Sequence, residues 1–358
     1  MEWMRSRIAA GGDRVAIDFP PFTPPRWLTN PHAQTLIASR KPRRWHYGWN
    51  SWEPISFDLG QEGTVTGEAS WQPGPRSASP LLFLTHGLEG SARSHYLIGM
   101  SRKAYCAGFH TVRVNTRNCG GTEHLTPTLY CAGLSQDILA IVRHFKRNMG
   151  ISEIFAAGVS LGANILLKFL GEQEDRGSEY VRGAAVLSPP VDLGAGVRQM
   201  EAPQNWIYQR YFVNKLIERM RRKTALFPHL GDMARIERIR TIHEFDDIVT
   251  APHFGFGNAD NYYRIASSGP LLKNIRVPTL IVQAKDDPLV PYKSFSRFGI
   301  ELNPAILLLT PDHGGHTGFL GTKASNAGDR DAYWGESRIV QFLGALAGRN
   351  GVRMGSAY

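Results

Sequence analysis

The feature that most restricts the fold is a series of short apolar runs, separated by longer segments of helical pattern, that begins at residue 81. Unalternated runs rich in Val, Ile and Leu are typical of strands that are buried on both faces. Strands separated by helices predict βαβ units and a mostly parallel sheet. We expect these strands at 81–87, 111–116, 154–160, 184–190, 278–284 and 305–310.

The segments between these runs complete the prediction of the fold class. Helical patterning marks 94–107, 133–149 and a helix that begins at Leu161. Upstream, 53–59 and 64–71 alternate polar and apolar residues, which predicts a pair of strands. The chain is therefore expected to be an α/β protein with a mostly parallel, doubly wound sheet.

One stretch is too long for a simple crossover between strands. About ninety residues separate the runs 184–188 and 278–282, where one helix would suffice. Helical patterning dominates 192–240, and a loop rich in Gly, Asn and aromatic residues follows at 252–263. We interpret the excess as a helical cap inserted above the carboxyl edge of the sheet, where open α/β sheets bind ligands.

These patterns divide the chain into three parts. Six prolines among the first 45 residues predict an irregular N-terminal arm, residues 1–50, packed on the body of the protein. The α/β core is expected to comprise 51–190 and 271–350, and the helical cap 191–270.

Composition argues against a disordered protein, a membrane-spanning protein and a disulfide scaffold. The chain has 358 residues, of which 42% are hydrophobic and 20% charged, the balance of a globular protein. No run approaches the ~18 apolar residues of a membrane helix, and the N-terminus lacks the apolar stretch of a secretory signal. Three cysteines (Cys106, Cys119 and Cys131) do not form a disulfide framework, so we expect a cytoplasmic location.

The charge is unevenly distributed. The formal net charge is +10, and 198–240 holds ten Lys and Arg against four Asp and Glu. This insertion is either a solvated helix face or a surface for weak contact with an anionic membrane. Zinc-finger spacing and RNP-like aromatic motifs are missing from the sequence, so we do not expect a nucleic-acid partner.

The strongest local signal for chemistry is the G-x-S-x-G sequence 158-GVSLG-162. The apolar run 154–158 leads into it, and a helical pattern from Leu161 follows it. A serine on such a strand-to-helix turn exposes its hydroxyl at the edge of the sheet. Ser160 is therefore the candidate nucleophile, and the alternative is a Gly-Ser turn that only caps a helix.

A serine nucleophile needs a base, and the base needs an orienting acid. In this architecture the order along the chain is Ser, then Asp or Glu, then His. Two carboxylates, Asp286 and Asp287, follow the strand near 278–282, and two histidines, His313 and His316, follow the next. We favour Asp287, which precedes a proline, and His316, which follows two glycines, but the sequence leaves the other two residues open as alternatives.

Two backbone amides are candidates for stabilising an oxyanion. The amide of Leu161 lies at the start of a helix, and that of Leu88 lies in the glycine-containing loop 86-HGLEG-90 after a strand. The alternative for this loop is an ordinary glycine turn. His313, His316 and the acids Glu244, Asp246 and Asp247 lack the spacing of a metal motif, so neither a metal nor another cofactor is expected.

Taken together, these residues resemble the α/β-hydrolase superfamily, and within it the YheT-like branch of bacterial hydrolases with their mammalian abhydrolase-domain relatives. The resemblance spans most of the chain. It is carried by 29-TNPHAQTL-36, 86-HGLEGSARSHY-96, 158-GVSLGAN-164, 255-GFGNADNYY-263, 285-KDDPLVP-291 and 314-GGHTGF-319.

By this resemblance the family's catalytic serine, acid and histidine fall on Ser160, Asp287 and His316. One departure is Asn261, where an acidic residue or threonine is expected. The resemblance implies hydrolysis of carboxylic esters, with lipid esters as substrates of some relatives. Those relatives often carry an N-terminal membrane anchor, which we do not expect here.

The leading hypothesis is thus a serine esterase for short-chain or lipid acyl esters, acting through an acyl-enzyme and needing no cofactor. One alternative is thioester or amide hydrolysis, or acyl transfer, by the same three residues. Another is a hydrolase-like protein that only binds a lipid or a partner. The sequence makes no prediction of the oligomeric state.

Overall fold

A central sheet of eight strands organises the computed structural model, which describes residues 4–10, 13–41, 52–326 and 328–348. The strand order is β10-β9-β8-β7-β5-β6-β4-β3. The strands are β3 (Glu53–Asp58), β4 (Thr64–Ser70), β5 (Leu81–Thr85), β6 (His110–Val114), β7 (Ile154–Val159), β8 (Gly183–Leu187), β9 (Thr279–Val282) and β10 (Ile306–Leu309).

The sheet is parallel except at one edge. Strands β5 to β10 all pair in parallel, whereas β3 pairs antiparallel with β4 and β4 antiparallel with β6. Side chains on β5 through β9 are buried along the whole strand, as the unalternated runs require. The six predicted parallel strands are therefore confirmed, and with them the fold class.

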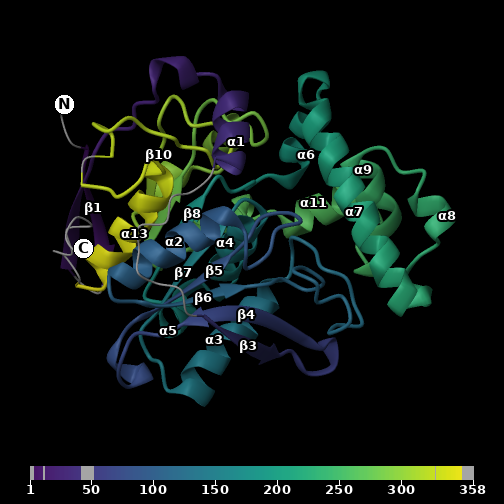
Figure 1. Cartoon of the computed structure of the whole chain (residues 1–358), viewed down its shortest axis with the longest axis horizontal. Helices are drawn as coiled ribbons and strands as arrows, with labels where there is room; N and C mark the ends of the chain where they lie inside the picture. Colours follow the sequence, from purple (N-terminus) through teal and green to yellow (C-terminus); the bar gives the residue numbers. More distant parts are fainter. Residues whose placement is uncertain (1–3, 11–12, 42–51, 327, 349–358) are drawn as a thin grey trace.

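Helices cover both faces of this sheet (Figure 1). On one face, α2 (His95–Cys106) and α13 (Trp334–Leu346) pack together and against β5 and β8. On the other face, α3 (Ser135–Met149) and α4 (Leu161–Gln173) share a second core with the sheet. The two short helices of the core are α5 (Gly177–Tyr180) and α12 (Lys293–Ser296).

Six further helices form a cap to one side of the sheet, on the right in Figure 1. They enclose a hydrophobic cluster of their own, against which Leu88 and Leu161 of the sheet edge also pack. The cap helices are α6 (Leu193–Glu201), α7 (Trp206–Leu226), α8 (Met233–Ile236), α9 (Ile242–Phe245), α10 (Ala251–His253) and α11 (Ala259–Ala266), with a π-helical segment η7 (Asp246–Thr250).

The expectation of a loop over 252–263 is wrong in part. Helix α11 begins at Ala259, because the Asn258 side chain accepts a hydrogen bond from the Asn261 backbone and caps its first turn. The glycine-rich composition of the segment is therefore confined to the turn between α10 and α11.

The N-terminal segment is also more regular than its prolines indicate. Strands β1 (Met4–Ala10) and β2 (Asp13–Phe19) form an antiparallel hairpin, and α1 (Pro31–Arg40) is a helix. Pro31 occupies the first position of α1, where a missing N–H costs nothing, and Asn30 caps the helix. The remaining residues of the predicted arm, 1–3, 11–12 and 42–50, lie outside the described residues.

Several positive charges of the cap are balanced by ion pairs with acidic side chains. Arg219 pairs with Glu89, Arg222 with Glu123 and Arg221 with Glu237. Arg219 and Lys223 are buried, and the ammonium of Lys223 donates to the backbone carbonyl of Glu123. Part of the basic stretch therefore holds the cap against the core through these ion pairs and hydrogen bonds. Among the described residues, no helix is both long enough and apolar enough to cross a membrane.

Candidate active site

Ser160 lies at the junction between β7 and α4, as its G-x-S-x-G sequence predicts. Its backbone has φ 51° and ψ −119°, a conformation that non-glycine residues rarely adopt. The flanking glycines permit this tight turn. A Cβ atom on Gly158 would lie 2.7 Å from the carbonyl oxygen of Gly162, and one on Gly162 would lie 2.4 Å from that of His86.

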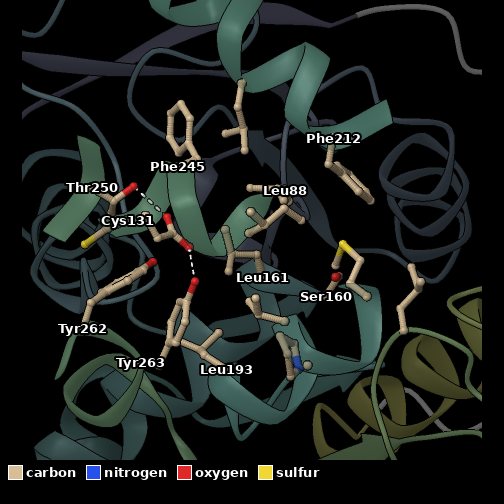
Figure 2. Close-up of a pocket in the computed structure, with 18 of the residues that line it drawn as sticks. Leu88, Cys131, Ser160, Leu161, Leu193, Phe212, Phe245, Thr250, Tyr262 and Tyr263 are labelled. Carbon is tan, nitrogen blue, oxygen red and sulfur yellow. Dashed lines mark hydrogen bonds between the residues drawn. The ribbon is translucent and has the colours of Figure 1, made fainter. Parts of the chain in front are cut away.

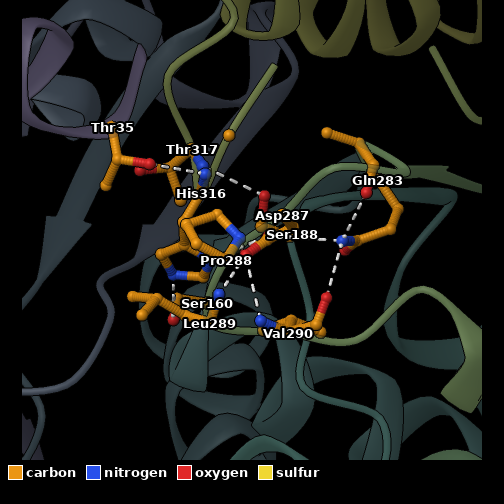
Figure 3. Close-up of polar contacts among 12 residues, drawn as sticks. Thr35, Ser160, Ser188, Gln283, Asp287, Pro288, Leu289, Val290, His316 and Thr317 are labelled. Carbon is orange, nitrogen blue, oxygen red and sulfur yellow. Dashed lines mark hydrogen bonds and ion pairs between the residues drawn. The ribbon is translucent and has the colours of Figure 1, made fainter. Parts of the chain in front are cut away.

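His316 lies in the loop after β10 and faces Ser160 (Figure 3). Its Nε2 atom is 3.0 Å from the Ser160 Oγ atom, and its Nδ1 atom is 2.9 Å from Oδ2 of Asp287. Because a carboxylate only accepts, the Nδ1–H group donates to Asp287, which leaves Nε2 free to accept the serine proton. The three predicted residues therefore meet in one chain of hydrogen bonds.

The Asp287 carboxylate is buried and fixed by several donors. Its Oδ1 atom accepts hydrogen bonds from the backbone N–H groups of Leu289 and Val290, both at 2.9 Å. Its Oδ2 atom also accepts from the Gln283 amide at 3.2 Å. These donors hold the carboxylate toward the imidazole, so the ring of His316 is oriented from behind.

The alternative residues, Asp286 and His313, form a pair of their own. Oδ2 of Asp286 lies 3.2 Å from Nδ1 of His313, and Oδ1 accepts a hydrogen bond from the Gly315 backbone. Burial raises the pKa of Asp286, while the Gly315 hydrogen bond and His313 oppose that rise. Neither side chain lines either of the two cavities described below, both of which contain Ser160. This second pair shapes the loop and does not contact the serine.

Helix α1 supports the His316 loop, which the sequence argument had missed. The His316 backbone N–H donates to the Thr35 hydroxyl at 2.9 Å. The buried Gln34 side chain donates to the Leu320 carbonyl and accepts from its N–H. The motif 29-TNPHAQTL-36 was noted only as part of a family resemblance, yet its Gln and Thr hold the loop in place.

The residue before His316 must be a glycine, Gly315, because of its backbone conformation and its close approach to α1. Its φ is 59°, and a Cβ atom there would lie 2.4 Å from the Pro31 carbonyl oxygen. The loop thus crosses α1 at van der Waals distance only because no side chain intervenes. After the histidine, the Thr317 backbone N–H donates to the hydroxyl of Ser188, the residue that follows β8.

The two candidate oxyanion donors come from different segments of the chain that meet near Ser160. Leu161 begins α4, and both Leu161 and Leu88 line the same cavity as Ser160. Across the described part of the chain, no protein acceptor takes a hydrogen bond from either backbone N–H. Both amides are therefore available to a ligand.

The loop that carries Leu88 is held by neighbouring side chains. The buried imidazole of His86 donates from Nδ1 to the Gly87 carbonyl and accepts the Thr116 N–H at Nε2. Burial lowers the pKa of His86 to about 4, so the ring stays neutral. The Tyr96 hydroxyl accepts the Gly87 N–H at 3.0 Å.

A buried ion pair links the same loop to the cap. Nη1 of Arg219, on α7, lies 2.7 Å from Oε1 of Glu89, and both side chains are less than a tenth exposed. The guanidinium also stacks 4.3 Å above the ring of Tyr130, whose hydroxyl donates to Glu89. The position of the loop therefore depends on a charge supplied by the cap.

Two cavities meet at Ser160. The inner cavity has a volume of about 100 Å³ and lies under the cap, with no exposed residue in its lining. Figure 2 shows Leu88, Leu161, Leu193, Phe212 and Phe245 among its apolar walls. The outer cavity, about 440 Å³, lies between α1 and the start of α7, and exposed residues such as Arg40 and Tyr211 line it. Both cavities contain Ser160 and His316.

Other chemistry finds little support in the site. In the part of the chain that the structure describes, no three His, Cys, Asp or Glu side chains are grouped to hold a metal. Burial raises the pKa of Cys119 to about 11 and that of Cys131 to about 12, so both thiols stay protonated.

Comparison with known proteins agrees with this geometry. A family model described as the alpha/beta hydrolase fold matches residues 80–321. The chain belongs to the α/β-hydrolase family. The matched range includes Ser160, Asp287 and His316, together with the cap between them.

Two relatives illustrate the range of this family. The hydrolase is 33% identical, over 327 residues, to the Escherichia coli (strain K12) protein named "Putative esterase YheT". The matched region covers 90% of this chain and 92% of that relative. It is 30% identical to phospholipase ABHD3 of Mus musculus over 245 residues, covering 68% of this chain and 59% of that protein.

A solved structure supports the fold. The Pyrococcus furiosus esterase Pf2001 superposes on this hydrolase with a TM-score of 0.52, covering 90% of this chain and 98% of that one. The sequence identity is 15%, so this likeness bears on the fold alone. The predicted membership of the YheT-like branch rests instead on the relatives in sequence, which confirm it.

Proposed function

We propose that this hydrolase is a serine esterase that cleaves carboxylic esters, with Ser160 as nucleophile, His316 as base and Asp287 as the orienting acid. The observation that carries the proposal is the chain of hydrogen bonds from Ser160 through His316 to Asp287, at the point where two cavities meet. The names of the similar proteins, an esterase and a phospholipase, support ester chemistry.

In the first half of the reaction, Nε2 of His316 takes the Ser160 proton while Oγ attacks the ester carbonyl. The resulting imidazolium faces the buried Asp287 carboxylate, which stabilises its charge. His316 then gives the proton to the departing alkoxide, and an acyl-enzyme and an alcohol result.

In the second half, water replaces the alcohol. His316 takes a proton from the water as it attacks the acyl-enzyme, and the acid leaves as Ser160 recovers its proton. In both halves the carbonyl oxygen becomes negatively charged. The backbone N–H groups of Leu88 and Leu161 are the donors proposed to stabilise it, aided by the N-terminus of α4.

The two cavities suggest how the ester is oriented. The walls of the inner cavity are mainly apolar side chains of the cap, which favour an acyl chain. The outer cavity reaches exposed residues, and an alcohol leaving on that side has a route to solvent by which water can also enter. We therefore propose acyl binding inside and alcohol binding outside, with acyl esters as the substrate class.

The experiment is a panel of 4-nitrophenyl esters of increasing acyl length, with two variants that each narrow one cavity. Met200→Trp reduces the inner cavity, and Ile207→Trp, its control, reduces only the outer one. We expect wild type to hydrolyse the esters, and Met200→Trp alone to shift the preference toward shorter chains. The proposal fails if wild type hydrolyses none of these esters, and the proposed orientation of the ester fails if Ile207→Trp causes the shift.

A further inference from the structure

The apolar lining of the inner cavity is interrupted by polar side chains at one end. Asp246, Thr250 and Tyr263 belong to the cap, and all three line the cavity that contains Ser160. In Figure 2, Thr250 and Tyr263 lie across the cavity from Ser160. Leu161 lies between Ser160 and these two residues in this view. A chain attached at Ser160 would therefore run past apolar walls toward polar groups.

Asp246 is the central member of this group. Its Oδ1 atom accepts a hydrogen bond from the Thr250 hydroxyl at 2.7 Å, and its Oδ2 atom accepts from the Tyr263 hydroxyl at 2.8 Å. Asp246 and Thr250 are the first and last residues of the π-helical segment η7. Such segments are rare and occur often at functional sites.

Asp246 differs from most of the deep carboxylates of this chain. Glu89 pairs with Arg219, Glu68 with Arg113 and Glu336 with Lys103. The buried Asp287 is the other exception named above, and it faces the imidazole of His316. Asp246 receives hydrogen bonds from two neutral hydroxyls, and no ion pair is formed with it by the residues that the structure describes. Among the described residues, His243 and Arg219 are the cations that act on this carboxylate, and neither forms an ion pair with it.

The carboxylate also has unused capacity to accept. Two oxygens offer about four acceptor positions, of which Thr250 and Tyr263 fill two. Asp246 is not fully buried, although it lies deep in the cap, which is consistent with its place in the cavity wall. A ligand that carries a hydroxyl can therefore donate a hydrogen bond to the Asp246 carboxylate. An all-hydrocarbon chain would instead exclude solvent from the carboxylate without replacing the lost hydrogen bonds.

We propose that Asp246 determines specificity by accepting a hydrogen bond from a hydroxyl on the acyl chain, remote from the ester carbonyl. The preferred substrates are then esters of hydroxylated fatty acids. This inference rests on the proposed function, because it assumes that the acyl chain occupies the inner cavity. Tyr263 and Thr250 position the carboxylate and are not themselves required to touch the substrate.

The test compares 4-nitrophenyl octanoate with its analogues that carry a hydroxyl at the third, sixth or eighth carbon. For wild type we expect one hydroxylated ester to have a kcat/KM at least tenfold above that of octanoate, chiefly through a lower KM. In Asp246→Ala this preference should fall at least tenfold, and Asp246→Asn, which keeps the shape and one acceptor oxygen, should lose less of it.

Asp247→Asn is the matched control. Asp247 is the next residue, is exposed and accepts the Ala259 backbone N–H, a bond that asparagine can keep, so the preference should stay at its wild-type value. Circular dichroism checks that each variant is folded. Hydrolysis of octanoate with no preference for any hydroxylated ester would overturn the inference and leave the proposed function intact.

Two further outcomes are decisive. A preference that persists in folded Asp246→Ala would assign the selectivity to another residue and overturn the inference. Loss of all ester hydrolysis in wild type would overturn the proposed function and the inference together. If Asp246→Ala does not fold, the wild-type panel and Asp246→Asn still give the answer.

Discussion

Nε2 of His316 lies 3.0 Å from Oγ of Ser160, although 156 positions separate the two residues in the sequence. The contact forms because β7 and β10 belong to the same parallel set, so the loops at their carboxyl ends lie at one edge of the sheet. The sheet topology is therefore sufficient to bring a nucleophile and a base together, and the details of each loop then set their separation.

The choice between the two adjacent carboxylates gives the first prediction. Asp287→Asn should lower kcat by about 10⁴-fold, since an amide in place of the carboxylate favours the wrong tautomer of His316. Asp286→Asn should lower kcat less than tenfold, because Asp286 contacts His313 and the Gly315 backbone, not His316. Steady-state kinetics of the two variants measures this. Comparable losses in both would show that the acid has been wrongly assigned.

The ion pair between cap and loop gives the second prediction. Arg219→Met leaves the Glu89 carboxylate buried without its cation, which should lower the free energy of unfolding by about 3–5 kcal/mol. It should also lower kcat, since the loop carrying the Leu88 amide loses its support from the cap. Urea unfolding and ester hydrolysis measure the two effects.

The control for that variant is Arg221→Met, on the same helix. Arg221 pairs with Glu237 at the surface, where an ion pair contributes at most about 1 kcal/mol. Adding Glu89→Gln to Arg219→Met should restore part of the lost stability, because no uncompensated charge then remains buried. Strictly additive losses in the double variant would show that Arg219 and Glu89 are not coupled.

The third prediction concerns pH. Burial raises the pKa of Asp246 from 3.8 to about 6, opposed by hydrogen bonds from Thr250 and Tyr263 and by the more distant charges of His243 and Arg219. Below about pH 6 the folded protein therefore binds a proton that the unfolded chain, with a pKa near 3.9, does not yet hold. The contribution of Asp246 to the free energy of unfolding therefore rises as the pH falls.

Relative to Asp246→Asn, which does not titrate, wild type should gain about 1 kcal/mol in free energy of unfolding between pH 7 and pH 5. Titrations of other groups cancel in this comparison. Urea unfolding of both proteins at the two pH values measures the difference. A constant difference, or one of opposite sign, would show that the carboxylate is not destabilised by its surroundings.

The sequence was sufficient to predict the strands of the main sheet and to favour Ser160, Asp287 and His316, although it left Asp286 and His313 open as alternatives. Both predictions rest on local pattern. Unalternated apolar runs locate buried strands, and polar side chains just beyond three strand ends must share one edge of a parallel sheet. The G-x-S-x-G turn was readable for the same reason, since Gly158 and Gly162 are required by the close approach of backbone at that point.

What the sequence could not predict depends on contacts between distant segments. The support of His316 by Thr35 joins residues 281 positions apart, and prolines near α1 suggested an irregular segment instead. Arg219 counted as one charge in a basic stretch, although it is buried against Glu89 from the core. Asp246 was considered only as a metal ligand, because its position in the cavity wall is a property of the packed cap.

The most direct test of the central claim is labelling with a fluorescent fluorophosphonate, which reacts with activated serines, of wild type, Ser160→Ala and His316→Ala. Labelling of wild type alone is the predicted result, because Ser160 has an imidazole within hydrogen-bond distance of its hydroxyl and a buried carboxylate behind that ring. Labelling that persists in Ser160→Ala, or folded wild type that resists the probe, would contradict the account.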